Sequence, residues 1–255
     1  MILAEKVSKR YGAKLALDKL DLQVSTGTVL GFIGPNGAGK TTTMRILAGT
    51  MPKSSGRVSI GGFDMDEEPL KAKALIGYLP ENAPLYSHTK VKAFLLFCAQ
   101  LRGIPENDIE RAVEKSIARC ELQSVVDEDM DALSKGFRRR VCLAQAIIHE
   151  PKVLLLDEPT DGLDPIQKMQ IRALIRELRA DKAIIVSTHI LEEVEAVCDR
   201  VLAIAGGKAV FDGTAAQFAA AGRPDEVFAA IVGGKPLPAG NFPSANFSIE
   251  GGAVK

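Results

Sequence analysis

The sequence predicts an α/β protein with a mostly parallel sheet, and three observations carry this prediction. Short, fully apolar runs at Val153–Leu156 and Ala183–Val186 are typical of strands buried on both faces. A helical pattern of apolar residues, from Ile171 to Leu178, lies between these two runs. A glycine-rich segment follows a third apolar run at Val29–Ile33. Strands that alternate with helices favour a parallel sheet covered on both faces.

The first 80 residues are expected to form short strands joined by turns. A glycine turn after Val29–Ile33 leads into a predicted helix at Thr41–Leu47. Gly49 is expected to end this helix, because glycine readily adopts the left-handed conformation that commonly follows a helix. Two further strands are predicted at Arg57–Ile60 and Ala74–Tyr78.

The segment from about residue 82 to 150 has a different periodicity and is expected to be entirely helical. The apolar residues Val91, Phe94, Leu95 and Cys98 follow the spacing of one face of a helix. A second stripe with helical spacing consists of Ile109, Ala112, Val113, Ser116, Ile117 and Cys120.

The end of the chain differs in composition from the rest. From about Gly222 onward it is rich in Gly, Pro and Ala, which predicts a segment that is ordered only in pieces. The expected organisation is one domain at 1–230, with a helical block inserted at about 82–150, and a tail at 231–255.

The balance of charged and apolar residues limits the classes of partner. The 255 residues include 32 Lys and Arg and 32 Asp and Glu, so the formal net charge is zero. A neutral chain has no global field that attracts phosphates, which disfavours a nucleic-acid binder. No apolar run approaches the roughly 20 residues of a membrane-spanning helix, and the N-terminus lacks the order of a signal peptide. We therefore expect a soluble cytoplasmic chain whose membrane role comes from a partner.

The four cysteines are expected to be small buried hydrophobic residues, because each lies in an apolar stretch. No two of them form a C-x-x-C pair, so a zinc site is not expected. They are Cys98, Cys120, Cys142 and Cys198.

The glycine turn matches the phosphate-binding pattern G-x-x-x-x-G-K-[ST] in full, between a predicted strand and a predicted helix. Backbone N–H groups of such a loop surround phosphate oxygens, and the helix N-terminus adds a favourable dipole. Lys40 is expected to reach the β- and γ-phosphates and to pack against nothing else, and Thr41 to place its hydroxyl on Mg²⁺. The residues predicted to bind the nucleotide here are Gly34, Pro35, Asn36, Gly37, Ala38, Gly39, Lys40, Thr41 and Thr42.

The apolar run Val153–Leu156 ends in two acidic residues. Asp157 would hold Mg²⁺ through its water shell, and Glu158 would accept a proton from an attacking water, which contributes about 10²–10⁴-fold. Strands often end in an acid, so this pattern is informative only together with the phosphate loop. Lys40 and Asp157 are 117 residues apart, far more than a minimal phosphate-loop unit needs. The helical block is the natural insertion between them.

A short segment in front of these acids makes a family resemblance specific. Leu133–Phe137 reads L-S-K-G-F, and its Ser134 stands 23 residues before Asp157. The segment resembles the L-S-G-G-Q signature of the ABC-transporter ATPases, with its third and fifth residues changed. The retained Ser134 and Gly136 are the two that the resemblance implies would contact a γ-phosphate. Three arginines follow, Arg138–Arg140, and are expected to be a solvated helix start rather than a phosphate or nucleic-acid site.

The resemblance covers about residues 1–230. It implies an α/β P-loop NTPase fold with a mostly parallel core sheet, an N-terminal antiparallel β subdomain and an inserted helical subdomain.

Four further positions are similar to family motifs. Asp161–Pro165 resembles the D-loop, which meets the opposite subunit. His189 ends the next apolar strand, 31 residues after Glu158, and resembles the histidine that bonds the γ-phosphate. Tyr11 occupies the place where the family stacks an aromatic ring on adenine, although an ordinary strand tyrosine is the alternative. Glu81 replaces the glutamine of the Q-loop and is expected to ligate Mg²⁺.

One branch of the family is the most similar. Gly77–Tyr86 and the variant signature resemble the single-domain ATPases of bacterial exporters for drugs and polysaccharides, including those linked to gliding motility. Asp225–Phe228 resembles the terminal helix of that branch. The competing hypothesis is a soluble ABC ATPase that acts on ribosomes or nucleic acid, although such proteins usually carry two ATPase units or a long coiled coil.

The resemblance implies a mechanism with ATP and Mg²⁺ as cofactors. Two ATP molecules would lie between two chains, and the signature of each chain would complete the site of the other. The expected partners are a second copy of the ATPase subunit and an integral-membrane permease, with no nucleic acid. The chain would then lie at the cytoplasmic face of the cell membrane, held there by the permease.

A last prediction concerns the permease. Leu85 and Tyr86 form a stretch more apolar than a free loop, which indicates an interface. We expect both residues, with the helix that follows, to line a groove for a short permease helix, and Glu81 to sense that helix. The alternative is that Leu85 and Tyr86 fold back onto the helical core.

Overall fold

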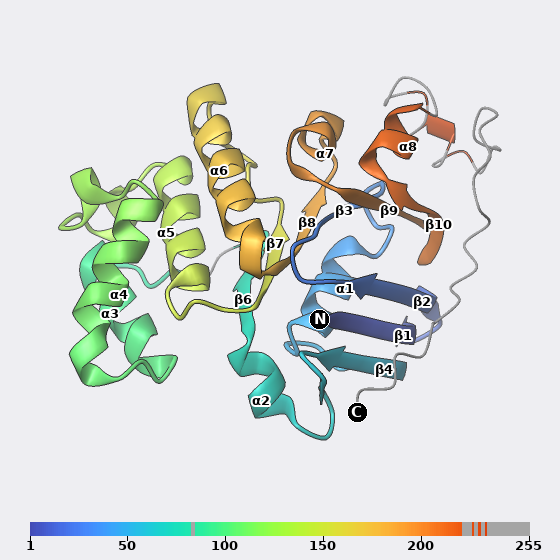
Figure 1. Cartoon of the computed structure of the whole chain (residues 1–255), viewed down its shortest axis with the longest axis horizontal. Helices are drawn as coiled ribbons and strands as arrows, with labels where there is room; N and C mark the ends of the chain where they lie inside the picture. The colour runs from blue at the N-terminus through green and yellow to red at the C-terminus, as the bar shows by residue number, and fades with distance from the viewer. Residues whose placement is uncertain (83–84, 221–225, 227–228, 231–232, 234–255) are drawn as a thin grey trace.

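The computed structural model describes residues 1–82, 85–220, 226, 229–230 and 233. Figure 1 shows an antiparallel sheet, a central sheet and a group of helices at the far end from the antiparallel sheet. The strands are β1 (Ile2–Tyr11), β2 (Lys14–Val24), β3 (Val29–Ile33), β4 (Ser55–Ile60), β5 (Phe63–Asp64), β6 (Ile76–Leu79), β7 (Val153–Asp157), β8 (Ala183–Thr188), β9 (Arg200–Ala205) and β10 (Lys208–Thr214). The helices are α1 (Lys40–Leu47), α2 (Pro69–Ala74), α3 (Val91–Leu101), α4 (Glu106–Arg119), α5 (Lys135–Ile147), α6 (Pro165–Leu178), α7 (Leu191–Val197) and α8 (Ala215–Ala220), with 3₁₀ turns at Gln123–Val125, Met130–Ala132 and Arg179–Asp181.

The central sheet has the strand order β10-β9-β3-β8-β7-β6. All its pairs are parallel except β9 with β10, which is antiparallel. Every residue of β3, β7 and β8 is buried, because helices and the second sheet cover both faces. The parallel sheet predicted from the apolar runs is therefore confirmed.

The second sheet, of order β2-β1-β4-β5, is antiparallel. Its apolar side chains share one core cluster with α1 and with one face of the central sheet. Leu22 of β2, Met44 of α1 and Ile185 of β8 belong to this cluster. The antiparallel N-terminal subdomain implied by the family resemblance is thus present, and α1 is packed between the two sheets.

Helices α3, α4 and α5, here called the helical arm, lie between β6 and β7 in the chain. Val91, Phe94 and Leu95 are buried as the helical periodicity predicts, whereas Cys98 is only half-buried. The strand predicted at Ala74–Tyr78 begins two residues later, because Ala74 is the last residue of α2. Pro69 at the start of α2 favours that helix, which the apolar pattern had not indicated.

The tail lies mostly beyond the part of the chain that the structure describes. The terminal helix predicted at Asp225–Phe228 falls outside the described residues except for Glu226. Within the described ranges, no helix is long and apolar enough to cross a membrane.

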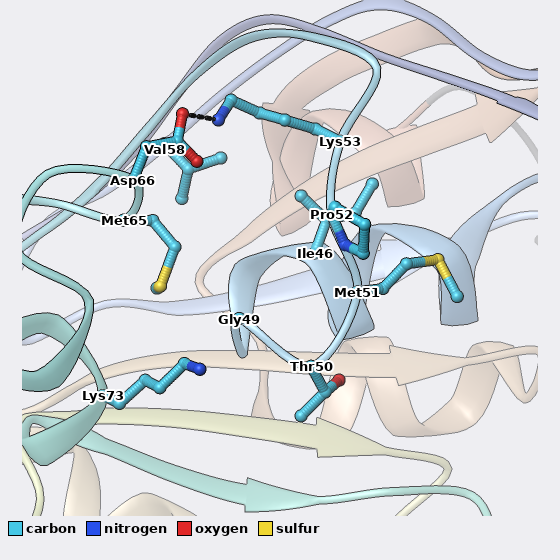
Figure 2. Close-up of a pocket in the computed structure, with 10 residues that line it drawn as sticks. All are labelled: Ile46, Gly49, Thr50, Met51, Pro52, Lys53, Val58, Met65, Asp66 and Lys73. Carbon is cyan, nitrogen blue, oxygen red and sulfur yellow. Dashed lines mark hydrogen bonds and ion pairs between the residues drawn. The ribbon is translucent and has the colours of Figure 1, made fainter.

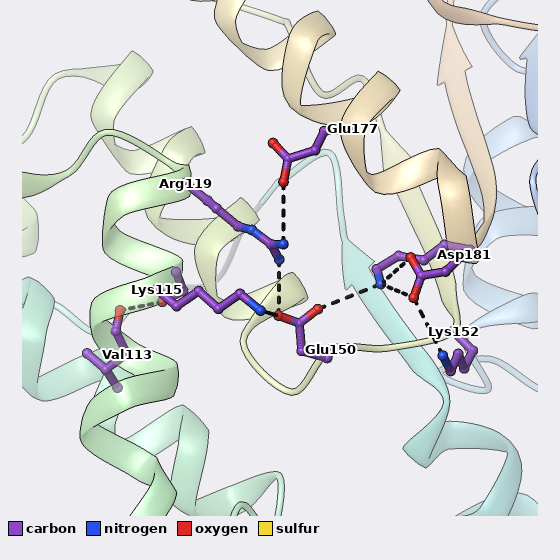
Figure 3. Close-up of polar contacts among 9 residues, drawn as sticks. Val113, Lys115, Arg119, Glu150, Lys152, Glu177 and Asp181 are labelled. Atoms are coloured by element: carbon purple, nitrogen blue, oxygen red, sulfur yellow. Dashed lines mark hydrogen bonds and ion pairs between the residues drawn. The ribbon is translucent and has the colours of Figure 1, made fainter.

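An ionic cluster joins the helical arm to the central sheet (Figure 3). The carboxylate of Glu150, between α5 and β7, lies 2.6 Å from Nζ of Lys115 and 3.0 Å from Nη1 of Arg119, both on α4. Arg119 also lies 3.4 Å from Glu177 of α6, and the buried ammonium of Lys182 lies 3.7 Å from Glu150. These contacts hold α4 against the core, although the exposed pairs among them contribute at most about 1 kcal/mol each.

The buried side chain of His149 is expected to make the stability of the chain depend on pH. Its Nε2 lies 3.1 Å from the carbonyl oxygen of Ile76, and burial lowers its pKa to about 4, with the charge of Arg102 acting in the same direction. An unfolded histidine has a pKa of about 6.5. Between these values the unfolded chain binds more protons, so stability is present above pH 6.5 and is lost as the pH falls toward 4.

We expect the free energy of unfolding of wild type to fall by about 1–2 kcal/mol more between pH 7.5 and 5 than that of His149→Gln. Urea unfolding of both proteins at the two pH values measures this difference. Equal losses in the two proteins would show that His149 does not contribute to the acid sensitivity.

Candidate functional site

The predicted site residues follow three neighbouring strands of the central sheet. The phosphate loop (Gly34–Thr41) follows β3, Glu158 follows β7 and His189 follows β8. Parallel strands place their carboxyl ends at the same edge of a sheet, and ligands of such sheets bind there. The order of the strands therefore brings together residues more than 100 positions apart in the sequence.

Two glycines of the phosphate loop occupy positions that other residues cannot take. Gly34 and Gly39 have φ angles of 159° and 114°. A Cβ added at Gly34 would clash with the carbonyl oxygen of Ile204, and one at Gly39 would lie 2.9 Å from that of Ala16. The loop then enters α1 at Lys40. The first N–H groups of a helix have no partner within the helix, so this end of α1 suits a phosphate.

Lys40 is buried, contrary to the expectation that it packs against nothing else. Its Nζ donates to the carbonyl oxygens of Gly34 at 2.6 Å and Pro35 at 3.4 Å. Burial lowers the pKa of Lys40, and the nearby charges of Glu158 and Asp157 oppose this effect. The ammonium therefore holds the loop closed on itself in addition to facing the acids.

A cavity of about 560 Å³ lies at this edge of the sheet and brings together most of the predicted nucleotide ligands. Tyr11, Glu81 and Glu158 line it together with the phosphate loop, although they come from three different parts of the chain. Lys14 and Ala16 also line it, and the sequence motifs do not indicate them. The lining residues are Tyr11, Lys14, Ala16, Pro35, Asn36, Gly37, Gly39, Lys40, Thr41, Thr42, Glu81 and Glu158.

Tyr11 is placed at the rim of this cavity and is 45% exposed. Its hydroxyl donates to Sδ of Met51 at 2.8 Å, and Nζ of Lys9 lies 5.2 Å from the ring centroid. The ring is therefore held from two sides while much of it remains accessible, as a stacking platform requires.

Asp157 is an almost fully buried acid, only 1% exposed. Neither of its carboxylate oxygens has a hydrogen-bond partner within the described part of the chain. Burial raises its pKa, the hydroxyls of Ser187 and Thr41 act in the opposite direction, and the charge of Glu81 raises it further. A buried carboxylate in this state is suited to a cation.

The donor set fits Mg²⁺ better than a metal held by protein alone. No three His, Cys, Asp or Glu side chains gather into a metal site among the described residues. Mg²⁺ typically takes one or two carboxylates, several waters and phosphate oxygens. Asp157 and the adjoining hydroxyl of Thr41 would supply the protein's share. Thr41 and Glu81 line the cavity, whereas Asp157 is buried behind it and is not among the lining residues.

Glu158 and His189 form a polar pair at the carboxyl ends of β7 and β8. Nδ1 of His189 lies 3.0 Å from both carboxylate oxygens of Glu158, and Glu158 is half-buried whereas His189 is exposed. The backbone of Glu158 is in the left-handed region with φ of 53°. Such a conformation costs a residue other than glycine of order 1–3 kcal/mol and is typical of functional sites.

The signature residues do not reach the cavity of their own chain. Ser134 caps α5, with its Oγ accepting a hydrogen bond from the backbone N–H of Phe137 at 3.3 Å. Gly136 is buried against α6, since an added Cβ would lie 2.5 Å from Oε1 of Gln167. Neither residue is among those that line the cavity. Figure 1 shows α5 beside α3 and α4 in the helical arm, and α1 between the two sheets.

Two of the three arginines after the signature are buried, so the expected solvated helix start is wrong for them. Arg139 and Arg140 are 7% and 5% exposed, whereas Arg138 is exposed. The helical spacing indicates the burial of Arg139, because Arg139 stands three and four positions before the buried Cys142 and Leu143 and so shares their face of α5. Because this face of α5 packs against the protein, the long side chain of Arg139 extends into the interior.

Two other hollows lie near the C-terminal end of α1. A groove of about 420 Å³ is lined by residues of β6, α3 and α5, among them Tyr78, Phe94 and Gln145. A smaller pocket of about 240 Å³ lies past the C-terminal end of α1 and shares Thr50 and Lys73 with the groove. Figure 2 shows Lys73 directed toward Gly49 in this pocket. Neither hollow is lined by the predicted nucleotide ligands.

Comparisons with known proteins identify the family. The ABC transporter family matches residues 17–161. An uncharacterised ABC transporter ATP-binding protein of Methanocaldococcus jannaschii is 38% identical over 83% of this chain and 77% of its own. A Nod factor export ATP-binding protein I of Sinorhizobium fredii is 35% identical over 81% of this chain and 61% of its own.

A solved ATP-binding subunit of an ABC transporter has a TM-score of 0.82 and 28% identity, over 91% of this chain and 99% of that subunit. The finer resemblance to gliding-motility ATPases stays a prediction, and the relatives reported give no support to a soluble ATPase acting on ribosomes or nucleic acid. The chain belongs to the ABC transporter family and is an ATP-binding, ATP-hydrolysing subunit of a transporter.

Proposed function

We propose that this chain binds Mg²⁺-ATP between two copies of itself and hydrolyses it to drive a membrane permease that exports its cargo. The main observation behind this proposal is that the phosphate-binding residues and the signature residues lie apart within one chain. The cavity of one chain holds the phosphate loop, Glu81 and Glu158, whereas Ser134 and Gly136 lie outside it. A second chain is therefore needed to bring a signature to the γ-phosphate.

The phosphate loop and the acids would divide the work of binding. The backbone of Gly34–Gly39 and the ammonium of Lys40 would hold the β- and γ-phosphates. The buried carboxylate of Asp157 and the hydroxyl of Thr41 would hold Mg²⁺, with Glu81 as a further oxygen ligand. The metal, when bound, would neutralise charge on the phosphates.

Glu158 is the residue that we assign to proton transfer. Its carboxylate lines the cavity, so it can accept a proton from a water that attacks the γ-phosphate. His189, 3.0 Å away, would orient that carboxylate and would bond the γ-phosphate with its other ring nitrogen. Loss of the γ-phosphate would remove the contacts to Ser134 and Gly136 of the second chain, and the pair would open.

The export direction and the place at the cytoplasmic face of the membrane rest on similarity. The Nod factor export protein of Sinorhizobium fredii supports export. A permease would hold this chain at the membrane, and a short helix of the permease is the occupant that we propose for the groove between β6, α3 and α5.

The structure corrects one residue of the predicted docking surface. Leu85 is half-buried and packs against the hydrophobic core that the helical arm shares with the central sheet, so it folds back onto the helical core. Tyr86 is 60% exposed, and its ring lies 6.1 Å from the rings of both Phe94 and Phe97. Phe94 also lines the groove. Tyr86 and Phe97 therefore remain the accessible apolar residues beside it.

Tyr86→Asp and Phe97→Asp are expected to weaken permease binding by about 30-fold or more, because an apolar anchor of an interface contributes at least about 2 kcal/mol. Co-expression with the permease of the neighbouring gene, followed by co-purification in detergent, measures the loss. Val210→Asp on β10 is the matched control, since Val210 is similarly exposed but lies on another element. Recovery of the permease at the wild-type level with both variants would place the docking surface elsewhere.

A further inference from the structure

Arg139 is a buried charge that binds the backbone of two distant segments. Its Nη1 donates to the carbonyl oxygens of Pro80 at 2.7 Å and of Glu81 at 2.8 Å. Its Nη2 donates to the carbonyl oxygen of Asp157, and to that of Glu158 at 2.6 Å. No carboxylate forms an ion pair with it in the described ranges. Four carbonyl dipoles therefore take the place of a counter-ion.

These four carbonyls belong to the two segments that carry the acids of the site. Pro80 and Glu81 follow β6, Asp157 ends β7 and Glu158 follows it. Arg139 itself is in α5, the helix that Ser134 caps. One guanidinium thus joins the signature helix to both acidic segments, which lie more than 70 residues apart in the sequence.

The contact to Glu158 has a specific consequence for its carboxylate. Glu158 has a φ of 53°, a conformation that persists only where the surroundings impose it. Its N–H donates to the carbonyl of Ser187 at 2.9 Å, and its own carbonyl accepts from Arg139 and from the N–H of Asp161 at 3.1 Å. Both sides of the residue are therefore held, which directs the side chain toward His189.

Only an arginine can make this set of contacts. The guanidinium is planar and rigid, and its two Nη atoms each reach a different segment. A lysine would keep the charge, but its donors radiate from a single nitrogen. Lysine can therefore bind one segment but cannot hold both at a fixed separation.

We propose that Arg139 is a positioning residue for ATP hydrolysis, which holds the backbone of Glu158 and Glu81 at a fixed place relative to the signature helix. This inference rests on the proposed role of Glu158 in proton transfer. Arg139 is not among the residues that line the nucleotide cavity. Its main effect is therefore on the rate of hydrolysis, through Glu158, with a smaller effect on the binding of Mg²⁺-ATP through Glu81.

Arg139→Lys in the full chain tests the proposal through the kinetic constants. We expect kcat for ATP hydrolysis to fall by about 10–100-fold, because a displacement of about 1 Å of a catalytic group can cost 10²-fold. The KM for ATP should change by less than about threefold, since the phosphate loop is not contacted. Arg138→Lys is the matched control, because Arg138 is exposed and its guanidinium donates to the carbonyl of Leu133 in its own segment. Its kcat should stay within about twofold of wild type.

A double variant separates positioning from a general weakening of the fold. In the Glu158→Gln background, Arg139→Lys should leave the residual rate unchanged within about threefold, because the group it positions is already lost. Thermal unfolding of each variant accompanies the kinetics. If Arg139→Lys lowers the residual rate further, or raises KM as much as it lowers kcat, its role is structural and the proposal is wrong.

The outcomes also separate this inference from the proposed function. Normal hydrolysis by Glu158→Gln would overturn the proposed role of Glu158 whatever Arg139→Lys does. An inactive Glu158→Gln with a normal Arg139→Lys would overturn the positioning role alone. Arg139→Gln, which loses the charge but keeps an amide, should have a lower kcat than Arg139→Lys. A higher kcat for Arg139→Gln than for Arg139→Lys would contradict the proposal that a positive charge at this position is needed for hydrolysis.

Discussion

Glu158→Gln is expected to slow ATP hydrolysis at least about 100-fold while ATP binding is retained, because only the proton acceptor is lost. Glutamine has nearly the same shape, so it can keep one contact to Nδ1 of His189, which lies 3.0 Å from both oxygens of Glu158. Phosphate release measures turnover, and a fluorescent ATP analogue measures binding. Glu195→Gln on α7 is the control, since Glu195 is exposed and lies outside the cavity.

Slow hydrolysis should also trap the paired state. Size-exclusion chromatography with saturating Mg²⁺-ATP is expected to show a dimer for Glu158→Gln and mostly monomer for wild type, because bound ATP stabilises the closed pair. The trap should depend on the signature of the second chain, so adding Ser134→Ala to Glu158→Gln should weaken the dimer. Ser134 lies outside the cavity of its own chain. A Glu158→Gln protein that stays monomeric would contradict the two-chain mechanism.

Lys40→Ala is expected to abolish measurable turnover and to weaken ATP binding by at least about 30-fold. Removing one partner of a buried, hydrogen-bonded charge pair costs roughly 2–5 kcal/mol. Lys40 is the lysine of the phosphate loop that lines the cavity, and burial makes its contacts stronger. Titration of ATP by calorimetry, with a phosphate assay for turnover, measures both effects.

The burial of Lys40 determines which controls this experiment needs. Alanine would leave the carbonyls of Gly34 and Pro35 without their donor, so the loop itself could open. Lys40→Met keeps most of the volume and should lose ATP binding equally. Lys92→Ala on α3 removes a half-buried lysine that lies outside the cavity, and should change neither constant. Near-normal hydrolysis by Lys40→Ala or Lys40→Met would overturn the assignment of the whole site.

The sequence by itself determined the features whose chemistry lies in adjacent residues. The phosphate loop could be predicted because Gly34, Gly39 and Lys40 act through a continuous stretch of backbone between one strand and one helix. The strands β7 and β8 could be predicted for a similar reason, since burial on both faces requires an unbroken apolar run. The family resemblance then related Ser134 and His189 to a nucleotide, although they are far from the loop in the chain.

Only the tertiary structure decided which side chains are buried and what they bind. Arg139 and Arg138 are neighbours of the same type, yet one donates to four carbonyls of two segments and the other is exposed. Leu85 and Tyr86 divide in the same way between the core and the surface. A contact between distant segments depends on how strands pair and helices pack, and burying a charge is favourable only where that packing supplies its partners. The helical period indicates which face of α5 carries Arg139, but no local pattern of residues identifies the four carbonyls that it binds.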